Sequence, residues 1–187
     1  MDLDVATDIS LLRHGETEGG ARYRGSTDVA LTAAGWAAMW AAVGDKNWDR
    51  IVCSPLQRCA DFARALAQQR SLPLALDTRW REMNFGAWEG KTAAEITGAD
   101  AAALARFWED PSNNGPPGGE PLAAVRARVL DAWRDVTSSR QSTLVITHGG
   151  PIRLILCHEA GHPFERLLEM DVAFASLHRL RRETQSS

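Results

Sequence analysis

The sequence predicts a three-layer α/β/α sandwich with a mostly parallel central sheet and an antiparallel strand at one edge. Two observations lead to this fold class. Short apolar runs typical of buried strands alternate along the chain with longer segments whose apolar residues recur at helical spacing. Two of the strand-like runs are followed by His-Gly, so each places a histidine where a parallel strand ends and ligands bind.

Five short apolar runs predict the strands of this sheet. Each is bounded by polar or turn-forming residues. They lie at residues 8–12, 51–53, 74–76, 143–147 and 172–180. The last run, from Val172 to Leu180, alternates only loosely, and we expect it at an edge of the sheet.

Helical spacing of apolar residues predicts four helices between the strands. They run from Thr32 to Val43, from Ser54-Pro55 to about Gln69, from Leu122 to about Thr137 and from Pro151 to about Ala160. Thr32 and Ser54 are expected as N-caps, with Pro55 in the first turn. Residues 92–119 are the least regular part, and the Gly- and Pro-rich run at 113–119 predicts a loop.

The bulk composition favours one soluble domain over residues 1–187 and excludes several classes of protein. A net charge of −3 argues against non-specific binding to nucleic acid. No apolar stretch approaches the roughly 20 residues of a membrane helix, and the first ten residues lack the apolar core of a secretory signal. The three cysteines lack metal-ligand spacing and suit reduced thiols in the cytoplasm, where we expect the protein.

Four basic side chains are expected to meet in one cleft. Arg13 and His14 follow one strand, and His148 follows another. Arg58 falls in the first turn of the helix after a third strand, where free backbone N–H groups also favour an anion. Two guanidiniums and two imidazoles around one small volume favour a phosphoryl group, whose oxygens match the planar fork of Arg.

His14 is the expected nucleophile. Nearby cations disfavour the imidazolium ion, so His14 is expected to stay neutral with a free lone pair. His148 is expected to donate hydrogen bonds to the phosphoryl oxygens as charge builds on them. In-line displacement by His14 would give a phosphohistidine, which water would then hydrolyse.

Glu82 is the best candidate for the acid that protonates the leaving group. It follows the strand at 74–76 and lies among apolar and aromatic residues, which favour the protonated carboxyl. Glu16 and Glu89 are alternatives that residue type alone does not rank below Glu82.

These residues fall in motifs that resemble the histidine phosphatase superfamily, the phosphoglycerate-mutase-like group. The motifs occur in the family's order and are Arg13–Thr17, Ser54–Arg58, Glu82–Gly90, Pro117–Glu120 and Thr147–Gly150. The resemblance implies a phosphohistidine at His14, a phosphate pocket of Arg13, Arg58 and His148, and Glu82 as proton donor. It also implies the three-layer fold, with no metal and no other cofactor.

Within this family the chain resembles the α-ribazole phosphatases of cobalamin biosynthesis. The likeness lies in its short length, the segment Arg22–Asp28 and the block Phe85–Gly90. It implies hydrolysis of a small-molecule phosphate ester, α-ribazole 5′-phosphate, to α-ribazole. Arg24, Gly25 and Gly149 are expected to contact this substrate beside Arg13, Arg58 and His148.

Two residues depart from the family's pattern. Gly20 stands six residues after His14, where many relatives carry an Asn that touches phosphate, so that hydrogen bond is lost. Pro121 stands where Ser often follows Gly-Gly-Glu, and the sequence offers no functional account of the change.

Two other functions fit the same residues. A phosphoglycerate mutase would use the same nucleophile but must exclude water, and the short segment between Glu82 and His148 favours an open site and hydrolysis. A non-catalytic module that binds phosphorylated ligands is the third reading. The complete set of nucleophile, acid and phosphate-binding residues argues against it.

Overall fold

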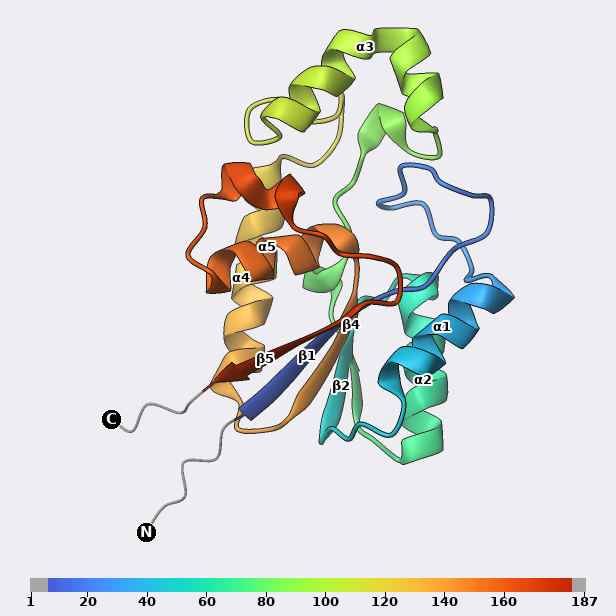
Figure 1. Ribbon diagram of the computed structural model, residues 1–187, viewed down its shortest axis with the longest axis vertical. Helices are drawn as coiled ribbons and strands as arrows, with labels where there is room; N and C mark the ends of the chain where they lie inside the picture. Colours follow the sequence, from blue (N-terminus) through green and yellow to red (C-terminus); the bar gives the residue numbers. More distant parts are fainter. Residues whose placement is uncertain (1–6, 183–187) are drawn as a thin grey trace.

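The computed structural model describes residues 7–182, which contain a five-stranded sheet in the order β3-β2-β4-β1-β5 (Figure 1). The strands are β1 (Thr7–Arg13), β2 (Arg50–Cys53), β3 (Leu74–Leu76), β4 (Thr143–Thr147) and β5 (Leu177–Arg182). The first four are parallel, and β5 is antiparallel to β1 at one edge, so the predicted sheet is confirmed. β5 begins later than the predicted Val172, because the chain first turns at Ala175, whose N–H donates to the His14 carbonyl.

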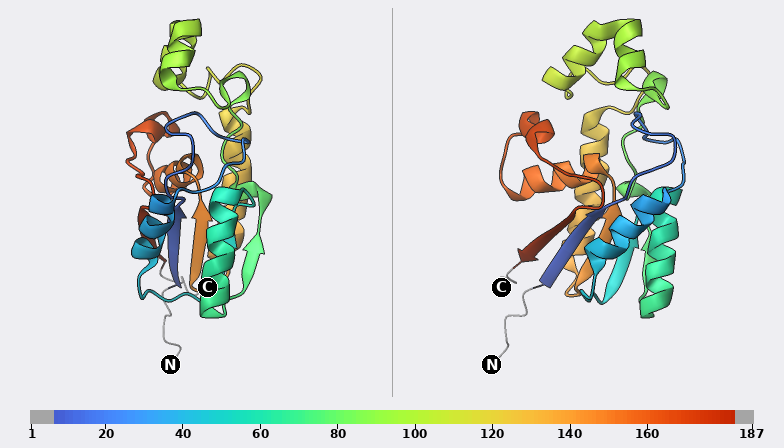
Figure 2. Two further views of the ribbon diagram at one scale, coloured as in Figure 1. Left: turned by 90° about the vertical axis from the view of Figure 1, so that its right-hand side faces the viewer. Right: turned by 45° about the vertical axis from the view of Figure 1, so that its right-hand side comes forward.

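Helices cover both faces of the sheet. The α-helices of residues 7–182 are α1 (Ala33–Val43), α2 (Gln57–Arg70), α3 (Ala93–Glu109), α4 (Leu122–Ser138) and α5 (Gly149–Glu159). Short 3₁₀ helices occupy Thr78–Trp80, Gly86–Trp88 and Phe164–Glu169. Figures 1 and 2 show α1 and α2 on one face and α4 and α5 on the other, which confirms the three layers. None of these helices is both long enough and apolar enough to cross a bilayer.

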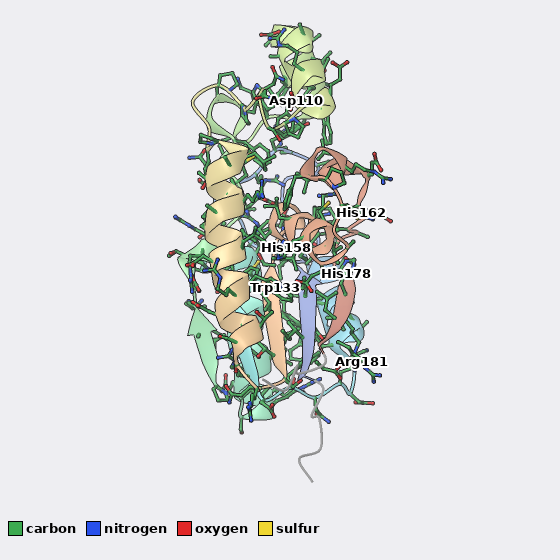
Figure 3. All side chains as sticks on the ribbon, turned by 90° about the vertical axis from the view of Figure 1, so that its left-hand side faces the viewer. Asp110, Trp133, His158, His162, His178 and Arg181 are labelled. Atoms are coloured by element: carbon green, nitrogen blue, oxygen red, sulfur yellow. The ribbon has the colours of Figure 1, made fainter. Side chains whose placement is uncertain are left out.

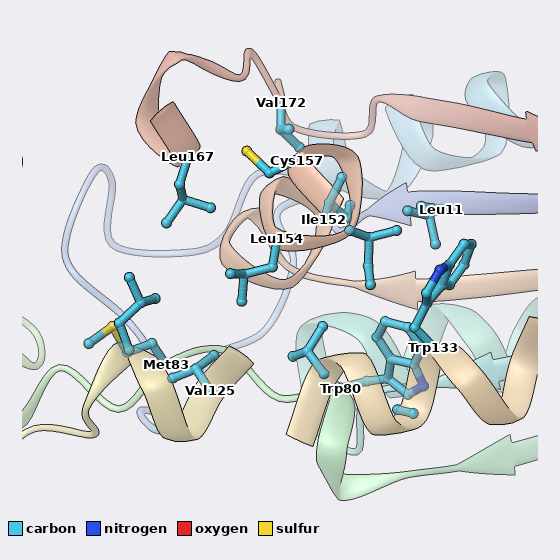
Figure 4. Close-up of a cluster of buried hydrophobic side chains, with 14 of the residues drawn as sticks. Leu11, Trp80, Met83, Val125, Trp133, Ile152, Leu154, Cys157, Leu167 and Val172 are labelled. Atoms are coloured by element: carbon cyan, nitrogen blue, oxygen red, sulfur yellow. The ribbon is translucent and has the colours of Figure 1, made fainter. Parts of the chain in front are cut away.

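Each face of the sheet has its own hydrophobic core. Ile9 and Leu11 face one core, with side chains of α4 and α5, whereas Leu12 faces the other, with side chains of α1 and α2. Parallel strands are apolar on both faces because helices cover both. Trp80 and Trp133 are the bulky residues of the first core (Figure 4). Figure 3 shows α4 lying along this face.

Two helices begin at other residues than predicted. Ser54 is not the N-cap of α2, which begins three residues later with Leu56 as its cap. The cause is that Ser54 is buried, and its hydroxyl lies 2.8 Å from His148 Nε2. α5 begins at Gly149, directly after His148, rather than at Pro151. The second shift brings the N-terminus of α5 directly to the end of β4, whereas α2 begins farther from the end of β2 than predicted.

The largest difference from the prediction is α3, which lies in the segment expected to be irregular. Its start has a capping box, in which Thr92 and Glu95 satisfy each other's backbone N–H groups. The helix breaks at Asp100, whose backbone is not helical (φ −157°, ψ 83°) and whose carboxylate accepts from Ala103 N–H. Figure 1 shows α3 beyond the carboxyl edge of the sheet, apart from both layers. The predicted loop at 113–119 is confirmed.

Candidate active site

The two His-Gly turns lie side by side because β1 and β4 are neighbouring parallel strands. Arg13 is paired in register with Thr147, and the His14 N–H donates to the Thr147 carbonyl at 3.0 Å. The rings of His14 and His148 are therefore in contact, with centroids 5.2 Å apart and planes at 64°. The structure thus brings together two residues that lie far apart in the sequence.

His14 has the tautomer of a nucleophile. Its Nδ1 lies 2.8 Å from the Gly15 carbonyl oxygen, which can only accept, so Nδ1 carries the proton and Nε2 keeps its lone pair. Burial, helped by the positive charge of Arg58, lowers the pKa of His14 to about 3. The ring is therefore neutral at physiological pH, as the sequence predicted, and it lines the cavity described below.

His148 is neutral too, but its ring nitrogens are both occupied. Arg58 Nε donates to Nδ1 at 3.2 Å, so the proton is on Nε2, which donates to Ser54 Oγ at 2.8 Å. The residue is completely buried, and burial, followed by the charge of Arg58, holds its pKa well below 6.5. His148 is not among the described residues that line the cavity. In this arrangement it supports Arg58 rather than offering a donor to a phosphoryl oxygen.

Arg58 is held in place by a loop. Its Nη1 donates to the Thr27 carbonyl at 2.8 Å, and its Nη2 donates to the carbonyls of Gly25 and Arg24 at 2.9 and 3.2 Å. The side chain is buried, yet it lines the cavity. Gly25 therefore acts behind Arg58, and like His148 it does not line the cavity among the described residues. A Cβ at Gly25 would collide with the Met83 carbonyl oxygen, so the loop needs glycine there.

The structure separates Glu89 from Glu82, two of the three glutamates that residue type left unranked. The Glu89 carboxylate accepts hydrogen bonds from the backbone N–H groups of Gly25, Ser26, Thr27 and Phe85, so it anchors the loop under Arg58. Burial alone would raise the pKa of Glu89, but these hydrogen bonds lower it below its ordinary value. Glu89 is thus a fixed carboxylate behind the site.

Glu82, in contrast, lines the cavity. Its Oε2 accepts from the Gly150 N–H in the first turn of α5, and its Oε1 accepts from the Met83 N–H, both at 3.0 Å. These two contacts fix the carboxyl at the cavity wall. Of the glutamates considered from the sequence, Glu82 is the one placed to reach a bound ester.

The cavity has a volume of about 370 Å³ and a strongly basic lining. Among the described residues its charged or titratable lining side chains are Arg13, His14, Arg22, Arg24, Arg58, Glu82 and Arg153. Gly149 and Gly20 also line it, and the Gly20 carbonyl accepts a hydrogen bond from Arg24. Five guanidiniums around one carboxyl group make this cavity suited to an anion.

Arg13 and Arg153 form one side of this cavity. Arg13 donates from Nη1 to the Val172 carbonyl at 2.6 Å and stacks 4.0 Å from the ring centre of Phe174. Its buried Nε has no hydrogen-bond partner within the described part of the chain. Burial lowers the pKa of Arg13, and the nearby positive charge of Arg153 adds to the shift. A bound anion would relieve both the repulsion and the unpaired donor.

Arg153 is a site residue that the sequence analysis missed. It lies in the first helix after the His148 turn, as Arg58 lies in the first helix after the Ser54 turn. This repeated position, an arginine in the helix that follows a strand end, could have identified Arg153 from the sequence. Its Nε donates to the Met170 carbonyl at 3.0 Å, and no described carboxylate forms an ion pair with its guanidinium. Tyr23 and Phe174 were also missed. Their rings line the cavity with that of Trp108, and the centre of the Phe174 ring lies 5.6 Å from that of the His14 ring.

A second, apolar cavity of about 110 Å³ adjoins the first. The two share the lining residues Tyr23, Glu82, Phe85, Trp108 and Arg153. The second cavity continues between α3, α4 and α5, where its walls are Met83, Phe107, Pro111, Leu122, Val125, Leu154, Leu167 and Leu168. The site therefore has a cationic part and an apolar part, with Glu82 and Arg153 at their junction.

Known proteins resemble this chain in sequence and in fold. The chain is 36% identical over 182 residues to a bifunctional protein of Mycobacterium tuberculosis, covering 91% of this chain and 50% of that protein, so it spans about half the length of that relative. It is 31% identical over 174 residues to the adenosylcobalamin/alpha-ribazole phosphatase of Salmonella typhimurium, covering 87% of this chain and 80% of that one. A solved mycobacterial glucosyl-3-phosphoglycerate phosphatase superposes with a TM-score of 0.82 at 28% identity, over 93% and 89% of the two chains.

The family assignment rests on nearly the whole chain. Residues 9–187 match the family model described as histidine phosphatase superfamily (branch 1). Relatives named as phosphatases agree with that match. The chain therefore belongs to the histidine phosphatase superfamily.

Proposed function

We propose that the protein hydrolyses a small-molecule phosphate monoester through a phosphohistidine at His14. One observation carries this proposal: a neutral His14 with an unprotonated Nε2 lines the same cavity as Arg13, Arg58 and Arg153. A nucleophile must keep a free lone pair, and a phosphoryl group needs cations around its oxygens. Both conditions meet in one volume.

The reaction has two balanced steps. His14 Nε2 attacks phosphorus, the bond from phosphorus to the ester oxygen breaks, and the leaving alkoxide takes a proton from Glu82. Water then attacks the phosphohistidine and gives a proton to the Glu82 carboxylate, while the bond from phosphorus to His14 breaks. Inorganic phosphate is released, His14 regains its lone pair, and Glu82 is protonated again. Hydrogen bonds from Gly150 and Met83 support this role because they fix the carboxyl beside the cavity.

The arginines stabilise the charge on the transferred group. Arg13 offers its unpaired Nε, and Arg58 retains one Nη1 hydrogen beyond those used on carbonyls and His148. His148 keeps Arg58 in position in the free enzyme and lies against His14. Its role as a donor to phosphate, implied by the family resemblance, requires that a phosphoryl oxygen replace Ser54 as the acceptor of the Nε2–H.

We further propose α-ribazole 5′-phosphate as the substrate and α-ribazole as the product, in cobalamin biosynthesis. The similarity to the Salmonella typhimurium enzyme supports this choice. The apolar cavity supports it as well, because the flat benzimidazole base of the leaving group needs apolar and aromatic walls such as Phe107 and Trp108. The three cysteines are free and buried, which suits the reducing cytoplasm in which we place this reaction.

A glucosyl-3-phosphoglycerate is the second candidate substrate. The carboxylate of its leaving group would suit the guanidiniums of Arg22, Arg24 and Arg153, which lie in the cavity beyond those proposed to hold phosphate. Structural similarity to a mycobacterial phosphatase of that name also favours it.

A turnover comparison on purified protein decides between these substrates. Phosphate release would be measured from α-ribazole 5′-phosphate, glucosyl-3-phosphoglycerate and 3-phosphoglycerate at matched concentrations. We expect the highest kcat/KM with α-ribazole 5′-phosphate, since it fills the apolar cavity. A higher value with glucosyl-3-phosphoglycerate would transfer the assignment to the second candidate. Formation of 2-phosphoglycerate instead of free phosphate would identify a mutase and overturn hydrolysis.

A further inference from the structure

We infer that the ion pair between Glu120 and Arg128 is a positioning device for the proton donor Glu82. This inference rests on the proposed function, in which Glu82 protonates the leaving group. It assigns a role to the Pro-Gly-Gly-Glu motif at 117–120, which the phosphate chemistry leaves unused. Neither Glu120 nor Arg128 lines the cationic cavity, so both act through Glu82 rather than on the substrate.

Every N–H of the Arg128 guanidinium is engaged. Nε and Nη2 donate to the two oxygens of Glu120 at 2.8 and 2.9 Å, a bidentate pair. The other hydrogens go to consecutive parts of one loop: Nη1 donates to the carbonyls of Arg79 and Arg81 at 2.8 and 2.6 Å, and Nη2 to that of Glu82 at 3.2 Å. Arg128 therefore ties the backbone of the Glu82 loop to helix α4.

The pair is partly shielded from water. The side chains of Arg128 and Glu120 are only 18% and 24% exposed. Shielding makes their hydrogen bonds stronger and their geometry stiffer than those of a surface ion pair. The pair between Arg134 and Asp131 on the same helix is a useful contrast, because its side chains are 74% and 51% exposed.

A second set of contacts docks the motif onto the residues that follow Glu82. Glu120 N–H donates to the Asn84 carbonyl at 2.8 Å, and Ala87 N–H donates to the Pro117 carbonyl at 2.9 Å. Gly86 has φ +51°, and a Cβ there would collide with the backbone of the Pro-Gly-Gly turn. The two loops therefore move as one body, with Glu120 linking them to Arg128.

The consequence concerns the place where the Glu82 carboxyl is held. Its side-chain anchors, Gly150 N–H and Met83 N–H, fix the oxygens, while Arg128 fixes the backbone from which the side chain extends. A proton donor must lie within hydrogen-bond reach of the ester oxygen, and a displacement of about 1 Å can cost about 100-fold in rate. Loss of the backbone anchor is therefore expected to impair proton donation before it impairs phosphate binding.

The test compares two esters that differ in their need for an acid. The leaving group of p-nitrophenyl phosphate departs without a proton, whereas an alkyl phosphate such as α-ribazole 5′-phosphate requires one. The readout is kcat/KM, which reports the phosphorylation step alone. For Arg128→Met we expect kcat/KM on the alkyl ester to fall by about 10- to 100-fold and on p-nitrophenyl phosphate by less than about threefold. Arg128→Lys should recover part of the loss.

Control variants make each outcome decisive. Arg134→Met, which removes an exposed ion pair of the same helix, should leave both esters unchanged. If circular dichroism shows that Arg128→Met is not folded, kcat/KM of Glu120→Gln on the same two esters provides the test. Equal losses on both esters, or no loss on either, would overturn the inference. Glu82→Gln is measured in parallel. If its kcat/KM falls equally on both esters, Glu82 is not the acid. If Glu82→Gln loses activity selectively on the alkyl ester but the Arg128 and Glu120 variants do not, only the positioning role is refuted.

Discussion

The ends of β1 and β4 carry the same His-Gly turn on neighbouring parallel strands, yet they present different histidines. His14 lines the cationic cavity and keeps Nε2 free, because the one hydrogen bond of its ring within residues 7–182 is that to the Gly15 carbonyl. His148 is fully buried, with one ring nitrogen bonded to Arg58 and the other to Ser54. Both rings are neutral and in contact, so charge does not distinguish them.

The distinction comes from what surrounds each ring. The residue before His14 is Arg13, which extends into the cavity, whereas the residue before His148 is Thr147, whose hydroxyl donates inward to the Trp80 carbonyl at 2.6 Å. A histidine whose two nitrogens are both satisfied by protein groups can orient its neighbours, and one with a bare nitrogen can attack. Four measurements test this division, beginning with the largest expected effect.

Removing the imidazole of His14, whose Nε2 is free to attack, should abolish phosphate transfer. In His14→Ala we expect kcat to fall by at least about 10⁴-fold, and no acid-labile phosphoenzyme should form after mixing with substrate. Radiolabelled phosphate retained on the denatured protein is the measurement. His158→Ala, an exposed histidine on α5, is the control and should keep full activity. Labelling of His14→Ala at the level of the parent protein would give the nucleophile to another residue.

Removing the supporting ring should slow the same reaction without changing its course. In His148→Ala, Arg58 loses its Nε partner, so kcat should fall by about 10²- to 10³-fold while the phosphoenzyme still forms. Rapid-quench measurement of phosphoenzyme formation separates the two histidines. If this variant, shown to be folded, forms no phosphoenzyme at all, the division between attacking and supporting rings is wrong.

Both neutral rings should make stability depend on pH. Burial lowers the pKa of His14 to about 3, while an unfolded chain binds that proton near pH 6.5. The unfolded state therefore takes up protons that the folded state refuses, and the free energy of unfolding decreases as the pH falls below 6.5. The expected loss between pH 7 and pH 5 is about 2 kcal/mol for His14, and His148 adds to it in the same direction. Urea unfolding at both pH values measures this loss. In His14→Asn the free energy of unfolding should decrease by about 2 kcal/mol less than in the parent protein. If the decrease is the same in both proteins, another group is responsible for it.

The smallest effect is expected at Ser54. Ser54→Ala leaves the Nε2–H of His148 buried without its acceptor, which costs about 1–3 kcal/mol. We expect Tm to fall by several degrees and kcat to fall only a few-fold, because Arg58 still holds the other side of the ring. Calorimetry and steady-state kinetics provide the two numbers. A loss of activity as large as that of His148→Ala would mean that the hydroxyl itself acts on the substrate.

Much of this fold follows from local pattern. The apolar runs predict all five strands because buried parallel strands need apolar residues on both faces, as at Leu11 and Leu12. α3 escaped prediction because Gly98 and the break at Asp100 interrupt its apolar spacing. The capping box of Thr92 and Glu95 was the one readable sign of its start.

The site was predictable to the extent that strand ends determine it. Neighbouring strands bring His14 and His148 together, and that could be inferred from the two His-Gly turns. The engagement of His148 could not be inferred, since it depends on Ser54 and Arg58, which reach it from other elements. The role of Gly25 could not be inferred either, because its backbone carbonyl, not a side chain, accepts the hydrogen bond from Arg58.

The position of α3 also affects how readily such a protein can evolve to accept new substrates. Its residues Ala93, Phe107 and Trp108 form outer walls of the two cavities, whereas the reacting groups come from strand ends and from the loop of Glu82. Diversity introduced into α3, Ala93–Glu109, by gene duplication or a laboratory library would therefore sample new esters while the bond-breaking apparatus stays intact. Selectivity and reactivity can evolve separately here because different stretches of polypeptide encode them.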